Sequence, residues 1–332
     1  MSLSFSVVIC AYTQARWLRL LEAVASAKAQ SLEPLEIIVC IDHNPELAES
    51  CREAWPEDTD GVRVIENRYP GRLGSARNTA LEIVRGSVVA FLDDDARAGS
   101  DWLLRLAELY DSDPRIQAVG CSPRPRFERD RPTWFPYEFD WVFGCAYRGL
   151  PTERGSVGRL IGAAMSVRRS AALAVRGFHS DDHDDMDLSH RLIHHYGPES
   201  VVYDPSIRVA HYVTAERLTW SYFWRRCFMV NRGKVLAFRD MEEAGNLSAD
   251  VAFGRSILRN AVPRYVLAPR ERRPLSAVAS IAGIVLAGLG HLVGRIYIRL
   301  GLTQPAATRG LDRPSEASAA AGARATACPE YW

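Results

Sequence analysis

The chain has 332 residues and a formal net charge of +1, and 47% of its residues are hydrophobic while 24% are charged. This length and composition suit one large α/β domain, or two smaller ones, around an ordinary core. The balanced charge argues against nucleic-acid binding, which needs a basic excess, so we expect no nucleic-acid partner.

Seven cysteines are scattered along the chain without a CxxC pair. Their odd number, and the position of Cys10 and Cys40 in apolar runs, predict reduced and buried thiols in a cytosolic compartment. The N-terminal stretch MSLSFSVVICAY has neither a basic region nor a small-residue cleavage site. We therefore expect it to form a first strand and not a signal peptide.

The first 124 residues alternate between strand and helix patterns. The β-branched run at 4–12 predicts a strand buried on both faces, and residues 18–30 have helical spacing. Further strands are predicted at 35–42, 61–67, 87–95 and 116–124, and further helices at 74–86 and 102–114. The alternation predicts an α/β fold with a mostly parallel sheet flanked by helices. Ligands bind such sheets beyond the carboxyl ends of the strands, where Tyr12, Asp42, Asn67 and the aspartates at 93–95 lie.

The chain changes character after residue 124. Residues 124–160 are rich in aromatic residues, proline and arginine, which predicts an irregular stretch. A strand and a helix follow within 160–178, and the helix predicted at 184–197 opens with acids. Beyond it we expect a strand at 200–213 and a basic helix at 217–240.

The segment 275–294 contains no Asp, Glu, Lys or Arg and is roughly long enough for one bilayer crossing. Arginines flank both ends, so their distribution gives no orientation. We expect contact with a membrane, either in the interface or as a hairpin; the alternative is a small-residue helix packed on the protein. The predicted organisation is a domain at 1–240, a C-terminal helical region at 241–303 with membrane association left open, and a disordered tail at 304–332.

Three consecutive aspartates, Asp93, Asp94 and Asp95, end the strand predicted at 87–95. Like charges this close raise one another's pKa unless a positive group intervenes. Carboxylates suit Mg²⁺ or Mn²⁺, and Mg²⁺ is commonly held by carboxylates together with substrate phosphates. The alternative is a helix cap, in which Asp95 or Ser100 caps the helix at 102–114.

Other polar groups accompany the three aspartates. The segment GRLGSARNTAL at 71–81 places glycines and Arg77 at a helix start, where backbone N–H groups favour phosphate, although Arg77 would fit a surface ion pair equally well. A second acidic cluster has aspartates at 181, 182, 184, 185 and 187 and can supply a general base. His211, at a strand end, can complete a metal shell. The alternatives are a solvated acidic loop and a buried, hydrogen-bonded imidazole.

Taken together, five segments resemble family 2 glycosyltransferases, which have the GT-A fold, over residues 5–240. The segments are VVICAYTQARWLRLLEAVAS, EIIVCID, NRYPGRLGSARNTAL, VVAFLDDDARAGSDWL and DDMDLSHRL. The resemblance implies a nucleotide-diphospho-sugar donor, with a UDP-sugar favoured, a divalent cation (Mg²⁺ or Mn²⁺) and an inverting single displacement. It implies donor-binding roles for Ala11, Tyr12, Asp42, Arg77, Asp93 and Asp94, metal-binding roles for Asp95 and His211, and a catalytic base at Asp185, with Asp184 as the other candidate.

No QxxRW motif is present, which favours transfer of a single sugar over polymerisation. We expect a cytoplasmic enzyme, peripheral or anchored at the inner face of the cell membrane, that uses a glycan or lipid-linked acceptor in cell-envelope or secreted-glycan synthesis. One alternative is a sugar-nucleotide-forming nucleotidyltransferase, although CAYTQARW lacks the glycines expected after its first strand. The other is a non-catalytic module that binds sugar nucleotides or glycans, although binding alone needs no second acidic cluster.

Overall fold

The computed structural model describes residues 3–56, 61–180, 183–237, 245–302 and 310–311. Its contacts divide the chain into two compact units. The first comprises Met1–Pro123 and Pro151–His211 with Gly310 and Leu311, and the second comprises Arg124–Leu150 and Tyr212–Pro305. The aspartates at 181 and 182, Cys328 and nearly all of the tail predicted at 304–332 lie outside the described residues.

A nine-stranded sheet has the order β3-β2-β1-β4-β8-β6-β9-β5, and β7 pairs with β9. Its parallel part is β1 (Phe5–Ala11), β2 (Glu36–Ile41), β3 (Val62–Glu66) and β4 (Val88–Asp93). The other strands are β5 (Ala96–Ala98), β6 (Ala118–Phe127), β7 (Gly155–Ser156), β8 (Ala164–Arg168) and β9 (Val201–Val213). Because β8 pairs antiparallel with both β4 and β6, and β9 with β5 and β7, the sheet is mixed and not mostly parallel as predicted.

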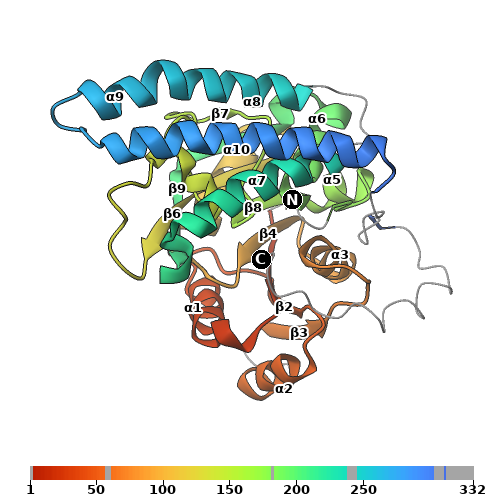
Figure 1. The fold of residues 1–332 in the computed structure, drawn as a ribbon. Helices are drawn as coiled ribbons and strands as arrows, with labels where there is room; N and C mark the ends of the chain where they lie inside the picture. The colour runs from red at the N-terminus through yellow and green to blue at the C-terminus, as the bar shows by residue number, and fades with distance from the viewer. Residues whose placement is uncertain (1–2, 57–60, 181–182, 238–244, 303–309, 312–332) are drawn as a thin grey trace. The chain divides into compact units, whose positions relative to one another are not determined.

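Helices cover both faces of the sheet in the first unit (Figure 1). They are α1 (Trp17–Lys28), α2 (Pro45–Ala54), α3 (Leu73–Ile83), α4 (Trp102–Ser112), α5 (Arg169–Ala174) and α6 (Asp184–Tyr196), with short 3-10 turns η1 (Gln14–Arg16) and η3 (Pro198–Ser200). The sequence prediction missed α2. Its signal was present, since Asn44 caps the helix by accepting a bond from the N–H of Leu47 and Pro45 takes the first turn.

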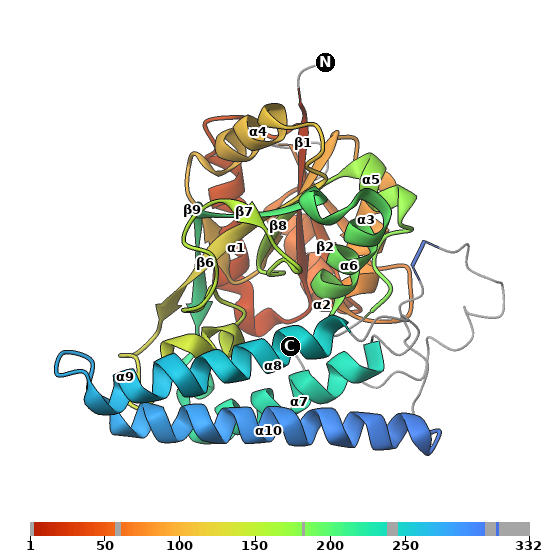
Figure 2. The same cartoon turned by 90° about the horizontal axis from the view of Figure 1, so that it is seen from above.

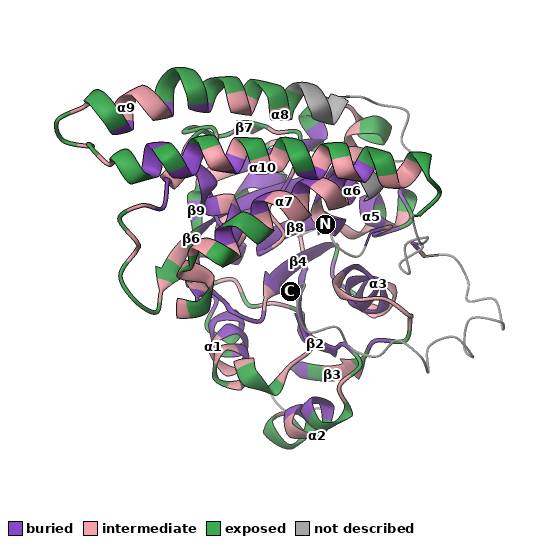
Figure 3. Ribbon diagram, in the orientation of Figure 1, coloured by how far each residue is buried: buried purple, intermediate pink, exposed green. Residues whose placement is uncertain are grey.

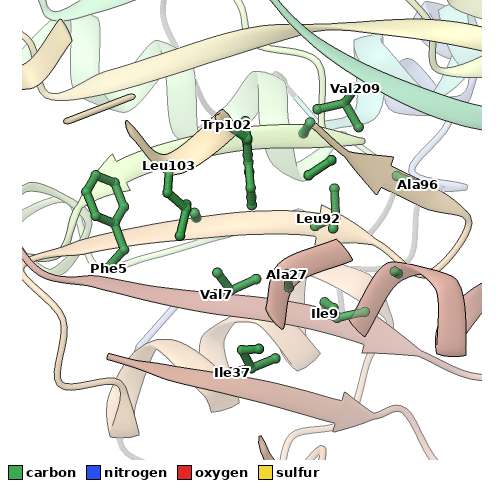
Figure 4. Close-up of a cluster of buried hydrophobic side chains, with 14 of the residues drawn as sticks. Phe5, Val7, Ile9, Ala27, Ile37, Leu92, Ala96, Trp102, Leu103 and Val209 are labelled. Atoms are coloured by element: carbon green, nitrogen blue, oxygen red, sulfur yellow. The ribbon is translucent and has the colours of Figure 1, made fainter. Parts of the chain in front are cut away.

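The pleat of the strands divides the core of the first unit into two clusters. Alternate residues such as Val7, Ile9 and Leu92 face a cluster that includes side chains of α1, α2 and α4, and Figure 4 shows Ala27, Trp102 and others of this group. The intervening residues face α3, α5 and α6. Burial on both faces explains why β1, β2 and β4 read as continuous apolar runs.

The second unit is mainly helical. It contains η2 (Tyr137–Phe143), η4 (Ala215–Leu218), α7 (Trp220–Ala237), α8 (Gly245–Ser256), the π-helical turn η5 (Ile257–Ala261), α9 (Val262–Leu267) and α10 (Pro274–Arg299). Aromatic side chains from η2 and α7 dominate its core. Figure 2 shows α7, α8 and α10 running alongside one another. Among the described helices, α10 is the one long and apolar enough to cross a membrane, with a hydropathy of 1.9.

The six cysteines among the described residues are free and buried, as predicted.

Candidate functional site

The carboxyl ends of the parallel strands meet at one edge of the sheet, as predicted. In the register of β1, Ala11 lies beside Ile41 of β2 and Cys10 lies beside Asp93 of β4. The next residue along each strand is therefore at the same edge, and the backbone N–H of Asp42 donates to the carbonyl of Ala11 (2.8 Å). This edge holds four of the residues that were predicted to bind the sugar donor, namely Ala11, Tyr12, Asp42 and Asp93.

A buried polar network fixes Asp42. The Asn67 side-chain amide donates to Oδ1 of Asp42 (2.7 Å) and to the hydroxyl of Ser75 (2.7 Å), and its oxygen accepts from the Thr79 hydroxyl (2.9 Å). Asp42, Asn67 and Ser75 are all buried. Because these bonds hold the carboxylate in one orientation, Asp42 presents a fixed acceptor group at the edge of the sheet.

The three aspartates form the end of β4 and the turn into β5. Asp93 is the last residue of β4, and Asp94 and Asp95 connect it to Ala96, where β5 begins. The alternative of a helix cap is wrong, because the residue that caps α4 is Asp101 and its side chain makes no capping bond.

Strand pairing brings His211 to this turn. Ala96 of β5 lies opposite His211 of β9, and Nε2 of His211 is 2.9 Å from Oδ1 of Asp95. One ligand atom from each of Asp93, Asp95 and His211 falls within 4.8 Å of the others. Two carboxylates and one imidazole form a donor set that suits a divalent cation, so the residues present fit the metal expected from the sequence.

Arg16 pairs with the last two aspartates of the turn but leaves one oxygen of Asp94 without a partner among the described residues. Nη1 of Arg16 is 2.8 Å from Asp94 and 3.2 Å from Asp95. Oδ2 of Asp94 is nevertheless buried without a hydrogen-bond partner among the described residues. Burial raises the pKa of Asp94, even though Arg16 opposes that rise. An additional cation would therefore be favoured here.

Arg77 is buried and links the aspartate turn to α6. One of its terminal nitrogens contacts Oδ2 of Asp184 (2.6 Å); the other contacts Oδ1 of Asp93 (3.1 Å) and the carbonyl oxygen of Gly162 (2.9 Å). Its exposed fraction is 1%, so the alternative of a surface ion pair is wrong. Gly74, one turn earlier in α3, has no space for a side chain, since an added Cβ would lie 2.2 Å from the carbonyl oxygen of Ser180.

The two aspartates that open α6 differ in their surroundings. Asp184 is buried against Arg77, and burial raises its pKa while the guanidinium opposes the rise. Asp185 is only partly buried and accepts bonds from the backbone N–H groups of Gly162 (2.9 Å) and Met186 (2.7 Å). Asp185 is thus the more exposed carboxylate, and Asp184 is held in an ion pair.

A third aspartate of α6 also has fixed partners. Asp187 accepts bonds from the backbone of His179 and from Arg191, both at 2.9 Å. Since Asp184 and Asp187 are buried and paired, a solvated acidic loop does not describe this part of the cluster.

Two residues that contribute to the site were not predicted from the sequence. Arg16 lies shortly after β1, and the rule that ligands meet strand ends would have drawn attention to it. Gly162 acts through its backbone, and an added Cβ would lie 3.3 Å from Oδ2 of Asp185. No side-chain motif reveals such a residue.

The family model described as "Glycosyl transferase family 2" matches residues 6–175, about half of the chain. The chain belongs to glycosyltransferase family 2. This glycosyltransferase is 31% identical over 232 residues to a protein of Haloferax volcanii named glucosyl-dolichyl phosphate glucuronosyltransferase, a match that covers 67% of this chain and 74% of the relative.

Solved structures share the fold of this glycosyltransferase. A Pyrobaculum calidifontis mannosyltransferase in complex with GDP-Man and Mn²⁺ aligns with a TM-score of 0.55 at 18% identity, covering 92% of this chain and 82% of that one. S. aureus TarS in complex with UDP-GlcNAc aligns with a TM-score of 0.51 at 14% identity, covering 90% and 92%. The predicted family and the GT-A type of α/β fold, with a C-terminal helical region, are confirmed. The roles of individual residues stay predictions.

Proposed function

We propose that this glycosyltransferase transfers one sugar from a nucleotide-diphospho-sugar to an acceptor hydroxyl, with inversion at the anomeric carbon and with a requirement for Mn²⁺ or Mg²⁺. One observation carries the proposal. Arg77 joins a metal-type cluster on one side, through Asp93, to the start of the helix that carries Asp185 on the other. Such a transfer needs both a site for the diphosphate and a base for the acceptor.

The metal-binding role falls to Asp93, Asp95 and His211. A bound divalent cation would supply positive charge for the diphosphate leaving group. Because one donor of the cluster is an imidazole nitrogen, we favour Mn²⁺ over Mg²⁺, which prefers oxygen ligands. This assigns Asp93 to the metal, whereas the resemblance implied a donor-binding role for it.

We assign the base to Asp185 and a positioning role to Asp184. Asp185 is the less buried of the two, and its backbone hydrogen bonds hold the carboxylate in one direction. Asp184 is engaged by Arg77 and therefore not available to an acceptor. A base on the side of the anomeric carbon opposite to the departing phosphate directs the incoming oxygen to that side, and this gives inversion.

The donor would lie along the carboxyl ends of β1 and β2, with Ala11, Tyr12 and Asp42 at the nucleobase and Asp94 near the diphosphate. The solved relatives bound to GDP-Man and UDP-GlcNAc show that both nucleotides occur with this fold. We favour a UDP-sugar for this chain, and Asp42, fixed by Asn67, is the group we expect to read the base.

We further propose a lipid-linked acceptor and a role in cell-envelope or secreted-glycan synthesis at the inner face of the cell membrane. The name of the Haloferax volcanii relative, which includes a dolichyl phosphate, supports an acceptor of this type. The free, buried cysteines support a reducing, cytoplasmic compartment.

The test is a transfer assay read by mass spectrometry. UDP- and GDP-sugars are offered with a polyprenyl-phosphate-linked saccharide, in Mn²⁺ or in EDTA, to the wild type, to Asp185→Asn and to the control Asp111→Asn, whose carboxylate is exposed on α4. We expect a product of inverted configuration, lost in EDTA and in Asp185→Asn but kept in Asp111→Asn. A retained configuration, full activity in EDTA, or release of pyrophosphate from a sugar phosphate and a nucleoside triphosphate would overturn the proposal.

A further inference from the structure

The helix α10 has a face of small residues that packs inside the second unit. An added Cβ on Gly290 would lie 2.2 Å from the carbonyl oxygen of Phe228, and one on Gly294 would lie 2.9 Å from the carbonyl oxygen of Arg232. Both contacts are with α7, and the residue numbers rise together, so the two helices run parallel in close backbone contact. Because only glycine fits at these positions, this face of α10 is committed to α7.

The opposite face of α10 is an exposed apolar stripe. Its members recur every three or four residues along the helix, which is about 39 Å long at 1.5 Å per residue. The stripe consists of Leu275, Val278, Ile281, Val285, Leu289, Leu292, Ile296 and Leu300, with exposed fractions from 42% to 64%. Figure 3 shows exposed and buried residues alternating along α10. A continuous exposed apolar stripe along a whole helix is typical of an interaction surface in soluble proteins.

The packing of α10 against α7 argues against a membrane crossing. Length and composition alone would allow α10 to cross. If it crossed while keeping its glycine contacts, however, α7 would enter the hydrocarbon alongside it. That helix carries Arg225, Arg226 and Arg232, of which Arg225 is exposed. Burying arginines in hydrocarbon is strongly unfavourable, so α10 is better suited to lie flat with only its stripe immersed.

The excess of arginine in this part of the second unit favours an anionic partner for the stripe. Residues 251–302 contain eight arginines, no lysine and one acid, Glu271. That acid is already paired with Arg148 (2.7 Å). Exposed arginines precede the stripe in sequence and also lie within its last turns: Arg255, Arg259, Arg270, Arg272, Arg295 and Arg299. A second copy of this basic region would repel the first, whereas an anionic lipid surface complements both the apolar stripe and the positive charge.

We propose that α10 lies in the plane of an anionic membrane surface, with its apolar stripe in the acyl-chain boundary and its arginines among the headgroups. Leu258 in η5 and Leu267 in α9 are further exposed apolar residues of the second unit. This membrane surface is where a lipid-linked acceptor would be met, so the inference rests on the proposed function. Lipid binding itself is measured without donor or acceptor, so the two can fail separately.

Co-sedimentation with vesicles tests the proposal. The full chain is mixed with vesicles of phosphatidylcholine alone or with an equal amount of phosphatidylglycerol. We expect binding to the anionic vesicles that weakens as NaCl is raised, and at least tenfold weaker binding of Val285→Asp/Leu292→Asp. The control Leu104→Asp changes an exposed apolar residue of α4 in the first unit and should bind like the wild type. Circular dichroism and gel filtration establish that each variant is folded.

Depth measurements separate lying flat from crossing. Nitroxide labels on cysteines placed at 278, 285 and 292, in a chain with Cys328 replaced by serine, should report one shallow depth. A deep central label between two shallow ones would overturn the in-plane orientation. Equal binding to neutral and anionic vesicles, no binding, or a dimer in ultracentrifugation that Val285→Asp/Leu292→Asp dissolves would overturn the anionic membrane as the partner.

Discussion

Nη1 of Arg77 lies 2.6 Å from Oδ2 of Asp184, and both side chains are buried. The contact joins residues 107 positions apart, one in α3 and the other at the start of α6. The same guanidinium also contacts Asp93, the last residue of β4. One positive charge is therefore shared between the proposed metal cluster and the helix that carries the proposed base.

The two aspartates of α6 should respond differently to the same substitution. Asp185→Asn should lower kcat by about 10²–10⁴-fold with donor affinity kept, because it removes a base and no structural ion pair. Asp184→Asn should lower the free energy of unfolding by about 3 kcal/mol, because it leaves Arg77 buried with less compensation. Steady-state kinetics and urea unfolding of both variants provide the check.

The reverse pattern would exchange the assignments. If Asp184→Asn were as stable as the wild type but inactive, and Asp185→Asn remained active, Asp184 would be the base.

Arg77→Lys should be a disruptive substitution. Arg77 contacts Asp184, Asp93 and the carbonyl of Gly162 through two nitrogens, whereas a lysine ammonium is a single point charge that cannot span these three groups. We expect a lower unfolding midpoint and a fall in kcat larger than the rise in donor KM. Arg63→Lys, at an exposed position of β3, is the control and should change neither quantity. Wild-type kcat in Arg77→Lys would show that Arg77 does not position the base.

How much of this site the sequence could predict depends on the distance of each contact along the chain. The strand ends and their polar residues were predictable, because alternating strand and helix patterns place Tyr12, Asp42 and Asp93 at one edge. The pairing of β5 with β9 is a contact between segments more than 100 residues apart, and no local pattern specifies that Ala96 lies opposite His211. His211 could be singled out from the sequence as a histidine at a strand end, and the family resemblance implied a metal-binding role for it, but its location beside Asp95 became clear only in the fold.

The mixed sheet and the different surroundings of Asp184 and Asp185 could not be predicted from the sequence, for a related reason. The strand Ala164–Arg168 is buried like its parallel neighbours, and its sequence does not reveal its direction. The two aspartates are adjacent and chemically identical, and the fold distinguishes them by placing Arg77 against Asp184 and the backbone N–H of Gly162 against Asp185.

Glu36 makes stability dependent on pH. Its carboxylate is buried, which alone would raise the pKa. Bonds from the backbone N–H of Arg85 (2.6 Å), the hydroxyl of Ser6 (2.7 Å) and the Arg85 guanidinium (3.1 Å) outweigh burial and lower the pKa. A lowered native pKa contributes stability above the unfolded pKa of about 4.3, and this stability is lost as the pH falls through the native value.

Glu36→Gln should therefore be less stable than the wild type by about 2 kcal/mol at pH 7, and the difference should shrink below pH 4. Urea unfolding at several pH values measures it. A difference that stays constant between pH 7 and pH 3 would show that the charge of Glu36 contributes nothing.

Two glycines of α10 form a matched pair for testing its packing on α7. Gly290→Ala places a Cβ against the backbone of Phe228 and should destabilise the second unit by about 2 kcal/mol. Gly288→Ala meets nothing within 4 Å and should instead stabilise the helix by about 0.5–1 kcal/mol. Thermal unfolding followed by circular dichroism distinguishes the two. Equal effects would mean that α10 does not pack on α7 through Gly290.

We propose that Asp93, Asp95 and His211 hold a cation against which a nucleoside diphosphate binds. The most direct measurement is calorimetric titration of UDP and GDP into the wild type and into Asp95→Asn, each in Mn²⁺ and in EDTA. We predict that one nucleotide binds the wild type in Mn²⁺ at least tenfold more tightly than in EDTA, and that Asp95→Asn loses this difference. Equal affinity with and without Mn²⁺, or a difference that survives in Asp95→Asn, would show that this cluster does not hold the cation.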